Sequence, residues 1–361
     1  MRIIIAAGGT GGHLYPGLAL AREFARQVPG SEVIFVGTTR GIETKVVARE
    51  GFELVMIKAQ GVMGKGIAGG VQGLAMLPVG LAQCLALCRE RRPDLVLGIG
   101  GYTSPPLILA ACLLGIKRAI LEPNAHPGMA NRALSPFASM VFVTFDDTVS
   151  FFGADKTRVV GTPIRREFLE EPAVAAKGQG PTLLVFGGSQ GARSINRAMI
   201  ATVPQLIAAC PTLSIIHQTG ERDFKEVAEV YRRVWPADRM TPEVVPFLYD
   251  MPRAFRQADL IVSRAGATTV AELTACGKPA ILIPFPHAIY AHQEQNARVL
   301  ERAGAAWVIR DSGLTGEVLA EAISSLLANP VRLTEMGQNS KALGRADSAE
   351  QVVRACRELV A

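Results

Sequence analysis

Residues 3–17, IIIAAGGTGGHLYPG, read as a buried strand, a glycine-rich turn and the start of a helix. Residues 183–197, LLVFGGSQGARSINR, repeat that order in the second half of the chain. A glycine-rich turn lets backbone N–H groups approach a ligand closely, and a helix that begins there adds a partial positive charge. Together they favour phosphate or another anion. The repetition predicts two domains that open with the same device.

Short, almost continuously apolar runs alternate with helix-length segments along the whole chain. Runs of this kind are typical of buried parallel strands. Six lie in each half, namely RIIIAA, EVIFVG, ELVMIKA, LVLGIG, KRAILE and SMVFVT, then TLLVFGG, LSIIHQTG, EVVPFL, LIVSRAG, PAILIPF and AAWVIR. The pattern predicts an α/β protein with two doubly wound parallel sheets, joined near residue 161.

The composition indicates a globular protein with more than one core. The chain has 361 residues, of which 49% are hydrophobic and 19% charged, so two domains are expected. Six cysteines are scattered without the spacing of a disulfide framework or a zinc site, which favours reduced core thiols. Asp146 and Asp147 are adjacent and lack the D-x-D spacing with which two carboxylates share a divalent ion. We therefore expect no metal and no cofactor.

The net charge of +6 is concentrated in the first half. Residues 1–160 carry 16 lysines and arginines against 11 aspartates and glutamates, and the rest carries 22 against 21. Such asymmetry suggests a polyanionic partner, although an uneven solvated surface would look the same. Aromatic residues are only 6% and are not interleaved with the basic ones, so an anionic membrane is favoured and no nucleic acid is expected.

Residues 66–88 contain no charged residue, and Lys65, Arg89, Arg91 and Arg92 flank them. The length could span a bilayer, but glycines, two glutamines and a proline interrupt the run. The segment is better suited to an interfacial surface on an anionic leaflet. An ordinary buried helix pair is the alternative. Only seven residues precede the first glycine turn, too few for a signal peptide, so we expect the protein to stay in the cytoplasm.

The glycine turns exclude two common nucleotide sites. The first turn does not form G-x-G-x-x-G, and no acidic residue ends the run EVIFVG, which disfavours a dinucleotide oxidoreductase. No P-loop sequence occurs either. The glycines could instead serve only tight turns, since residues 98–106, GIGGYTSPP, form a third such cluster.

Three polar features follow predicted strands, where open α/β sheets bind ligands. His13 follows the first glycine turn and could act as a base, hydrogen-bond a ligand or be structural. Glu272 falls in the early turns of a helix predicted in SRAGATTVAEL, residues 263–273. Its carboxylate could complement the helix N-terminus or accept hydrogen bonds from two ribose hydroxyls. The loop at 284–297 is rich in hydrogen-bonding side chains, namely His287, His292, Gln293, Gln295 and Asn296.

Seven ordered motifs carry a resemblance over essentially the whole chain: GGTGGHLYPG, GIGGYTSPP, EPNAHPG, VVGTPIRREF, FGGSQGARSIN, RAGATTVAE and HQEQNA. They resemble the bacterial peptidoglycan glycosyltransferases of the MurG family. The resemblance implies the GT-B architecture, two Rossmann-like domains facing a deep cleft. It implies an acceptor and membrane domain at 1–161, a donor domain at 162–341, and a C-terminal helix, about 342–361, that packs on the first domain.

The resemblance also implies an activity. Family members move N-acetylglucosamine from UDP-GlcNAc to the C4 hydroxyl of MurNAc in lipid I, with inversion at the anomeric carbon, giving lipid II and UDP. His13 then becomes the expected base, and Glu122 is a second candidate. Without a metal, the charge developing on UDP would be stabilised by the glycine turns, the helix N-termini and Arg165.

The donor contacts implied by the resemblance lie mainly in the second domain. Glu272 resembles the ribose-binding carboxylate, and Ser189 with Arg165 resembles the phosphate-side contacts. Leu248 resembles the residue whose backbone meets uracil, and Gln293 with Asn124 the contacts to the sugar. The complete expected set is Thr10, Gly11, Gly12, Asn124, Arg165, Ser189, Leu248, Ala267, Thr268, Thr269, Val270, Ala271, Glu272 and Gln293.

The partners implied are UDP-GlcNAc, lipid I, an anionic membrane surface, and proteins of wall synthesis and cell division. The expected location is peripheral, on the cytoplasmic face of the bacterial plasma membrane. Two other functions stay open at this point. A sister glycosyltransferase acting on diacylglycerol or another lipid would share the fold and donor loops, and a non-catalytic membrane scaffold would not need intact donor motifs.

Overall fold

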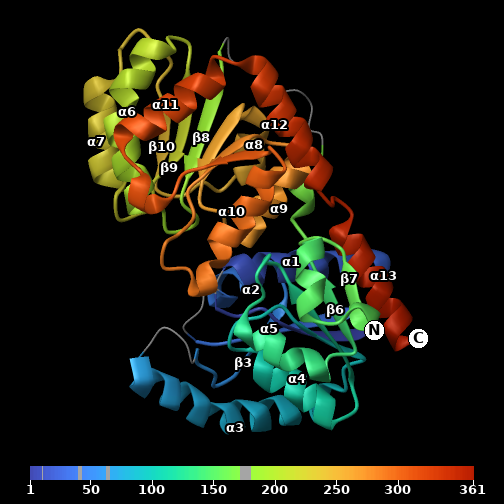
Figure 1. Ribbon diagram of the computed structural model, residues 1–361. Helices are drawn as coiled ribbons and strands as arrows, with labels where there is room; N and C mark the ends of the chain where they lie inside the picture. Colours follow the sequence, from blue (N-terminus) through green and yellow to red (C-terminus); the bar gives the residue numbers. More distant parts are fainter. Residues whose placement is uncertain (10, 40–42, 62–65, 171–179) are drawn as a thin grey trace. The chain divides into compact units, whose positions relative to one another are not determined.

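The computed structural model describes residues 1–9, 11–39, 43–61, 66–170 and 180–361. They form two compact units. Unit 1 contains Met1–Arg165 and returns at the end of the chain with Arg345–Ala361, and unit 2 contains Arg166–Gly344. Each unit is built on one parallel sheet with helices packed against it, as Figure 1 shows.

The sheet of unit 1 has the strand order β3-β2-β1-β4-β5-β6-β7, and every pairing is parallel. The chain therefore starts in the middle of the sheet and winds outward in both directions. The strands are β1 (Arg2–Ala6), β2 (Glu32–Gly37), β3 (Glu53–Met56), β4 (Leu95–Gly98), β5 (Lys117–Glu122), β6 (Met140–Val143) and β7 (Thr157–Val159).

Side chains along β1 alternate between two cores. Ile3 and Ile5 belong to the core on one face of the sheet, and Ile4 and Ala6 to the core on the other. Both faces are covered, which explains why the strand is apolar throughout. The covering helices are α1 (Gly11–Gln27), α2 (Glu43–Arg49), α3 (Gly66–Arg91), α4 (Ser104–Leu113), α5 (Met129–Leu134) and α13 (Ser348–Val360), with short 3-10 turns η1 (Ser135–Phe137), η2 (Asp146–Phe151) and η3 (Ala154–Lys156).

Helix α13 completes the core of unit 1 although it comes from the other end of the chain. It lies beside α1 (Figure 1), and Val352, Val353 and Cys356 are buried in the same core cluster as Ile3. Burial raises the pKa of the Cys356 thiol to about 12, so that thiol stays protonated. The described cysteines are all free thiols.

The sheet of unit 2 has the order β10-β9-β8-β11-β12-β13 and is also parallel. Its strands are β8 (Thr182–Phe186), β9 (Ser214–Gln218), β10 (Glu243–Val245), β11 (Leu260–Ser263), β12 (Ala280–Leu282) and β13 (Ala306–Val308). Its helices are α6 (Arg193–Ala209), α7 (Phe224–Val234), α8 (Met251–Gln257), α9 (Ala267–Cys276), α10 (His292–Arg302), α11 (Gly316–Leu327) and α12 (Pro330–Leu343), with 3-10 turns η4 (Arg166–Phe168), η5 (Ile289–Ala291) and η6 (Asp311–Gly313).

The expectation of two doubly wound parallel α/β domains is confirmed, and each of the twelve predicted apolar runs contains a strand. The sequence analysis missed β7, a three-residue edge strand whose hydrogen-bonded neighbour is β6. Its run is too short and too polar to stand out. Within the part of the chain that the structure describes, no helix is both long enough and apolar enough to cross a membrane.

Candidate functional site

Two glycine turns of unit 1 pack against each other at the carboxyl ends of β1 and β4. The Gly8 amide donates to Thr103 Oγ1 at 3.1 Å. A methyl group on Gly101 would come within 2.4 Å of the Gly8 carbonyl oxygen, and Gly101 has a φ of +71°. Only glycine fits at position 101, because any side chain would meet backbone and strain the left-handed conformation. These glycines therefore serve close packing as well as ligand access.

His13 lies in the first turn of α1, against the second glycine turn. A methyl group on Gly100 would stand 3.0 Å from His13 Nε2, and one on Gly101 would stand 3.5 Å from His13 Nδ1. The ring is half-buried, so it is held by the turn but not sealed from solvent. A half-buried imidazole at the carboxyl edge of a parallel sheet is well placed for proton transfer to a ligand bound there.

Glu122 ends β5 and is only 1% exposed. One oxygen accepts from the Asn124 amide N (3.0 Å) and Asn124 Nδ2 (3.1 Å), and the other accepts from the Gly128 amide N (2.9 Å) and Asn131 Nδ2 (3.0 Å). Burial raises the pKa of the Glu122 carboxyl above its usual range, and the hydrogen bonds from Asn124 and Gly128 act against it. Four donors fill the acceptor sites of a carboxylate, so this side chain fixes the loop that carries Asn124.

The remaining unit 1 candidates are placed as follows. Thr10 lies outside the described residues, and Gly11 and Gly12 are the first residues of α1. Arg165 ends the first segment of unit 1, and its guanidinium lies 5.1 Å from the centroid of the Tyr15 ring on α1. That contact is a cation–π arrangement.

In unit 2 the glycine turn after β8 is locked to the turn after β9. A methyl group on Gly191 would come within 1.9 Å of the Thr219 carbonyl oxygen, and one on Gly220 within 2.1 Å of the Gln190 carbonyl oxygen. Both glycines have positive φ, +73° and +80°. The turn is thus rigid where it packs, while Ser189 at its tip is exposed.

Two helices of unit 2 begin at neighbouring strand ends without a capping side chain. Helix α6 follows β8 and α9 follows β11, and these strands are adjacent in the sheet. Ala192 is the N-cap residue of α6 and Gly266 that of α9, and neither makes a side-chain hydrogen bond to the helix N–H groups. Uncapped N–H groups of two helix starts at one sheet edge favour an anion with several oxygens, such as a diphosphate.

Helix α9 carries the expected motif ATTVAE at residues 267–272. Glu272 is 6% exposed and lies in the second turn. The hydroxyl of Thr268 is buried and has no hydrogen-bond partner among the described residues. Because buried polar groups nearly always find a partner, the Thr268 hydroxyl in the first turn of α9 is suited to a hydrogen bond with a bound ligand.

Gln293 lies in the first turn of α10, after an unusual backbone. Its Oε1 accepts from the Phe285 amide N at 3.0 Å, which leaves the side-chain NH₂ group as the end that can donate to a ligand. Tyr290 and Ala291 just before it have φ of +54° and +50°. Such left-handed conformations of L residues cost roughly 1–2 kcal/mol each and often mark functional sites.

Leu248 lies between β10 and α8, and its side chain is buried. Phe247 and Tyr249 on either side are exposed, with their ring centroids 4.9 Å apart. The buried Leu248 side chain anchors the loop between two exposed rings. The structure thus brings Ser189, Leu248, Glu272 and Gln293 to loops and helix starts that follow strands β8, β10, β11 and β12.

A buried hydrogen-bonded chain supports the turn after β9. His217 Nδ1 lies 3.1 Å from the Tyr231 hydroxyl, and Nε2 lies 3.1 Å from Asn196 Oδ1. Asn196 Nδ2 donates in turn to Thr219 O and to Asp223 Oδ2. Burial lowers the pKa of His217 to about 3, so the ring is neutral, with Nε2 donating to Asn196 and Nδ1 accepting from Tyr231. This histidine is structural.

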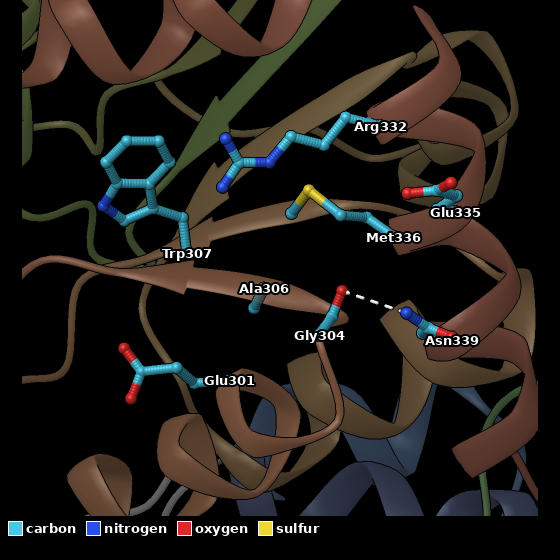
Figure 2. A pocket seen from close by; sticks show the side chains of 8 residues that line it. All are labelled: Glu301, Gly304, Ala306, Trp307, Arg332, Glu335, Met336 and Asn339. Carbon is cyan, nitrogen blue, oxygen red and sulfur yellow. Dashed lines mark hydrogen bonds between the residues drawn. The ribbon is translucent and has the colours of Figure 1, made fainter. Parts of the chain in front are cut away.

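Unit 2 also has a pocket of about 470 Å³ that shares no residue with the donor motifs. Figure 2 shows it between the end of α10, the edge strand β13 and α12, with the Arg332 guanidinium over the Trp307 ring at 5.2 Å. The Asn339 side chain donates to the Gly304 carbonyl at 3.4 Å across it. In the sheet, β12 separates β13 from β11, and β12 and β11 together separate it from β8. The candidate site is therefore defined by the strand ends and not by this pocket.

The sequence analysis missed the polar side chains that hold the loops in place. Arg264 follows β11 directly, and its position in a strand-ending SRAG sequence was a usable signal. Glu43, which accepts from the Thr38 and Gly9 amides, gave none, because its partners are distant or backbone atoms. Among the described residues no group of three or more histidine, cysteine, aspartate or glutamate side chains could hold a metal ion.

Family models of known proteins match both halves of the chain. The model of the glycosyltransferase family 28 N-terminal domain matches residues 3–143, and that of the C-terminal domain matches residues 182–352. The fold and site thus define a glycosyltransferase with two Rossmann-like domains of the GT-B type. The chain belongs to glycosyltransferase family 28.

Curated relatives cover almost the full length. A protein of Geobacter metallireducens is 46% identical over 98% of this chain and 97% of its own, and one of Syntrophus aciditrophicus is 46% identical over 100% and 99%. Both are named UDP-N-acetylglucosamine–N-acetylmuramyl-(pentapeptide) pyrophosphoryl-undecaprenol N-acetylglucosamine transferase. The crystal structure of Acinetobacter baumannii MurG is similar with a TM-score of 0.79 and 30% identity, covering 99% of this chain and all of that one.

Proposed function

We propose that this chain is the N-acetylglucosaminyltransferase of peptidoglycan synthesis that its relatives are named for. It transfers GlcNAc from UDP-GlcNAc to the C4 hydroxyl of MurNAc in lipid I, with inversion, and releases lipid II and UDP. The observation that carries the proposal is the pair of uncapped helix starts, α6 and α9, at adjacent strand ends, with the buried carboxylate of Glu272 one turn further along α9. That set matches a diphosphate attached to a ribose.

The donor residues have distinct roles in the proposal. The N–H groups at the start of α6 and α9, with Ser189, bind the diphosphate, and Glu272 accepts from the ribose hydroxyls. The backbone at Leu248 meets uracil, and the donating end of Gln293 meets the sugar. Residues 267–271 line the donor through the first turns of α9, where the orphan hydroxyl of Thr268 supports a ligand contact. Thr10, Gly11, Gly12, Asn124 and Arg165 are the further donor contacts that the family resemblance implies.

His13 is the proposed base that takes the proton of the attacking C4 hydroxyl. Its half-buried ring leaves it accessible, whereas the Glu122 carboxylate is 1% exposed and occupied by four donors. A general base must be accessible to the hydroxyl whose proton it removes. We therefore assign proton transfer to His13 and positioning of Asn124 to Glu122.

The exposed side of α3 supports the proposed membrane contact. One face of α3 packs on the sheet through Cys84, Leu87 and Cys88. The other face is exposed and apolar, through Ala75, Pro78, Val79, Ala82 and Ala86. A helix of a globular protein normally exposes polar residues, so an apolar outer face followed by exposed Arg89 fits the interface of an anionic leaflet. The proposed location is peripheral, on the cytoplasmic face of the plasma membrane, where wall-synthesis and division proteins are further proposed partners.

The test is transfer of labelled GlcNAc from UDP-GlcNAc by the purified chain to lipid I or to diacylglycerol in mixed micelles. We expect label in a lipid II product only, and loss of transfer in Glu272→Ala with donor binding weakened by about 2–3 kcal/mol, since charge-assisted hydrogen bonds are lost. Transfer to diacylglycerol instead would identify a sister enzyme. No transfer and no UDP-GlcNAc binding would identify a non-catalytic protein and refute the proposal.

A further inference from the structure

One buried arginine in unit 2 joins the loops that carry the donor residues. The Arg264 side chain is 11% exposed. Its Nη1 donates to the carbonyl oxygens of Ile283 and Pro284, each at 3.1 Å, and to Asp311 Oδ1 at 2.6 Å. Its Nη2 donates to Ser194 Oγ at 2.8 Å. The guanidinium thus connects the end of β11 with the loop after β12, the turn η6 and the start of α6.

The polar contacts form a closed triangle. Ser194 Oγ, in the first turn of α6, donates to Asp311 Oδ1 at 2.6 Å while it accepts from Arg264. A hydroxyl has one proton to donate, so its direction is fixed by the aspartate. Each member has a charged or hydroxyl partner, and the buried charge of Arg264 is compensated by Asp311, which is 19% exposed.

The triangle reaches the sugar-side loop through backbone. Arg264 holds the Pro284 carbonyl and lies 5.5 Å from the Phe285 ring centroid, and the Phe285 amide in turn donates to Gln293 Oε1. On the same helix as Gln293, Asn296 Nδ2 donates to the Ala265 carbonyl at 3.2 Å. Hydrogen bonds therefore connect the start of α10 to the loop after β12 through Gln293, and to the turn before α9 through Asn296.

We propose that Arg264, with Ser194 and Asp311, is a positioning group for the diphosphate and sugar part of the donor. It sets the start of α6 relative to the loop that carries Gln293, without touching the donor itself. The inference rests on the proposed function, because it assumes that these loops bind UDP-GlcNAc. It assigns no role toward uracil, since the contacts of the triangle do not reach the loop at Leu248.

The test compares donor fragments by calorimetry and competition. In Arg264→Lys the amine keeps the charge but cannot reach four acceptors, so we expect UDP-GlcNAc to bind at least tenfold more weakly while the inhibition constant of uridine changes less than twofold. Ser194→Ala and Asp311→Asn should weaken UDP-GlcNAc binding about threefold or more. Their double variant should be less than additive, because the two side chains bond each other.

Arg332→Lys is the matched control, because Arg332 also lies over an aromatic ring of unit 2, in the pocket of Figure 2 away from the donor motifs. We expect its donor affinity to equal that of the wild type. Should Arg264→Lys fail to fold, Ser194→Ala, at a half-buried site, carries the test. Equal weakening of uridine and UDP-GlcNAc, or no weakening, would overturn the positioning role. Absence of UDP-GlcNAc binding by the wild type would instead overturn the proposed function.

Discussion

At the scale of single residues, the two candidate bases of unit 1 differ in what their side chains already do. The His13 ring rests against a glycine turn and remains half-buried. The Glu122 carboxylate is saturated by the amides of Asn124, Gly128 and Asn131. In the sequence both residues were candidate bases, because their side chains can take up a proton and both lie near the end of a predicted strand. The hydrogen bonds in the structure distinguish them.

The first residue-scale prediction concerns proton transfer. His13→Ala should lower kcat by roughly 10²–10⁴ because the attacking hydroxyl loses its base, while the affinity for UDP-GlcNAc stays within twofold of wild type. A general base must be unprotonated to act, so we expect kcat of the wild type to fall toward acid pH and this fall to be absent in His13→Ala. Steady-state kinetics across pH and donor calorimetry measure both effects.

Glu122→Gln provides the comparison for His13→Ala. The new NH₂ group would face N–H groups of the loop that also donate. We therefore expect Asn124 to contact UDP-GlcNAc less well and the protein to be less stable, while kcat still falls toward acid pH. The assignment is reversed if Glu122→Gln abolishes that pH dependence and His13→Ala keeps it.

At the scale of elements, α3 shows how one helix can serve two surroundings. Its inner face packs against α4 and the sheet, and Leu81 is partly buried against that core. Its outer face presents Val79, which is 45% exposed. Apolar residues lie on both faces of the helix because one face packs into the core and the other, in our proposal, enters the membrane interface.

We predict that Val79→Asp reduces binding to vesicles of anionic phospholipid at least fivefold, since a charge opposes insertion of the face that carries it. Transfer to lipid I in those vesicles should fall in parallel, and transfer to a short-chain soluble acceptor should be unchanged. Sedimentation with vesicles and the two transfer assays measure this.

Val318→Asp is the control for that variant, because Val318 is 41% exposed on α11 of unit 2, close to the exposure of Val79. It should leave vesicle binding unchanged. Equal loss of activity on the soluble acceptor in Val79→Asp would place the outer face of α3 in folding or catalysis rather than at the membrane.

At the scale of the whole molecule, the chain closes its first unit with its last helix. Unit 1 consists of two segments, and Val353 on α13 is fully buried beside the central strands. Both tryptophans, Trp235 and Trp307, lie in unit 2. Tryptophan fluorescence therefore reports unfolding of unit 2, and hydrogen exchange of β1 and β2 reports unit 1.

Val353→Ala should reduce the stability of unit 1 by about 1.5–3 kcal/mol, because two buried carbon atoms are lost and a small cavity remains. Amides of β1 and β2 should exchange faster, while the urea midpoint seen by tryptophan fluorescence stays unchanged. Arg354→Ala, on the exposed side of α13, should change neither within about 0.5 kcal/mol. If the stability from tryptophan fluorescence falls as much as the stability from exchange of the β1 amides, α13 stabilises both units equally.

The sequence by itself determined the features that depend on local pattern. Apolar runs placed twelve of thirteen strands, because a strand buried on both faces must be apolar throughout. Glycine turns marked the ends of strands, and ordered motifs identified the family. Tertiary structure alone decided which polar groups meet. The bonds from Arg264 to Ser194 and Asp311 join residues 70 and 47 positions away, and no local pattern encodes such a contact. The exposed face of α3 is a second case, because burial depends on what packs against a residue and not on the residue itself.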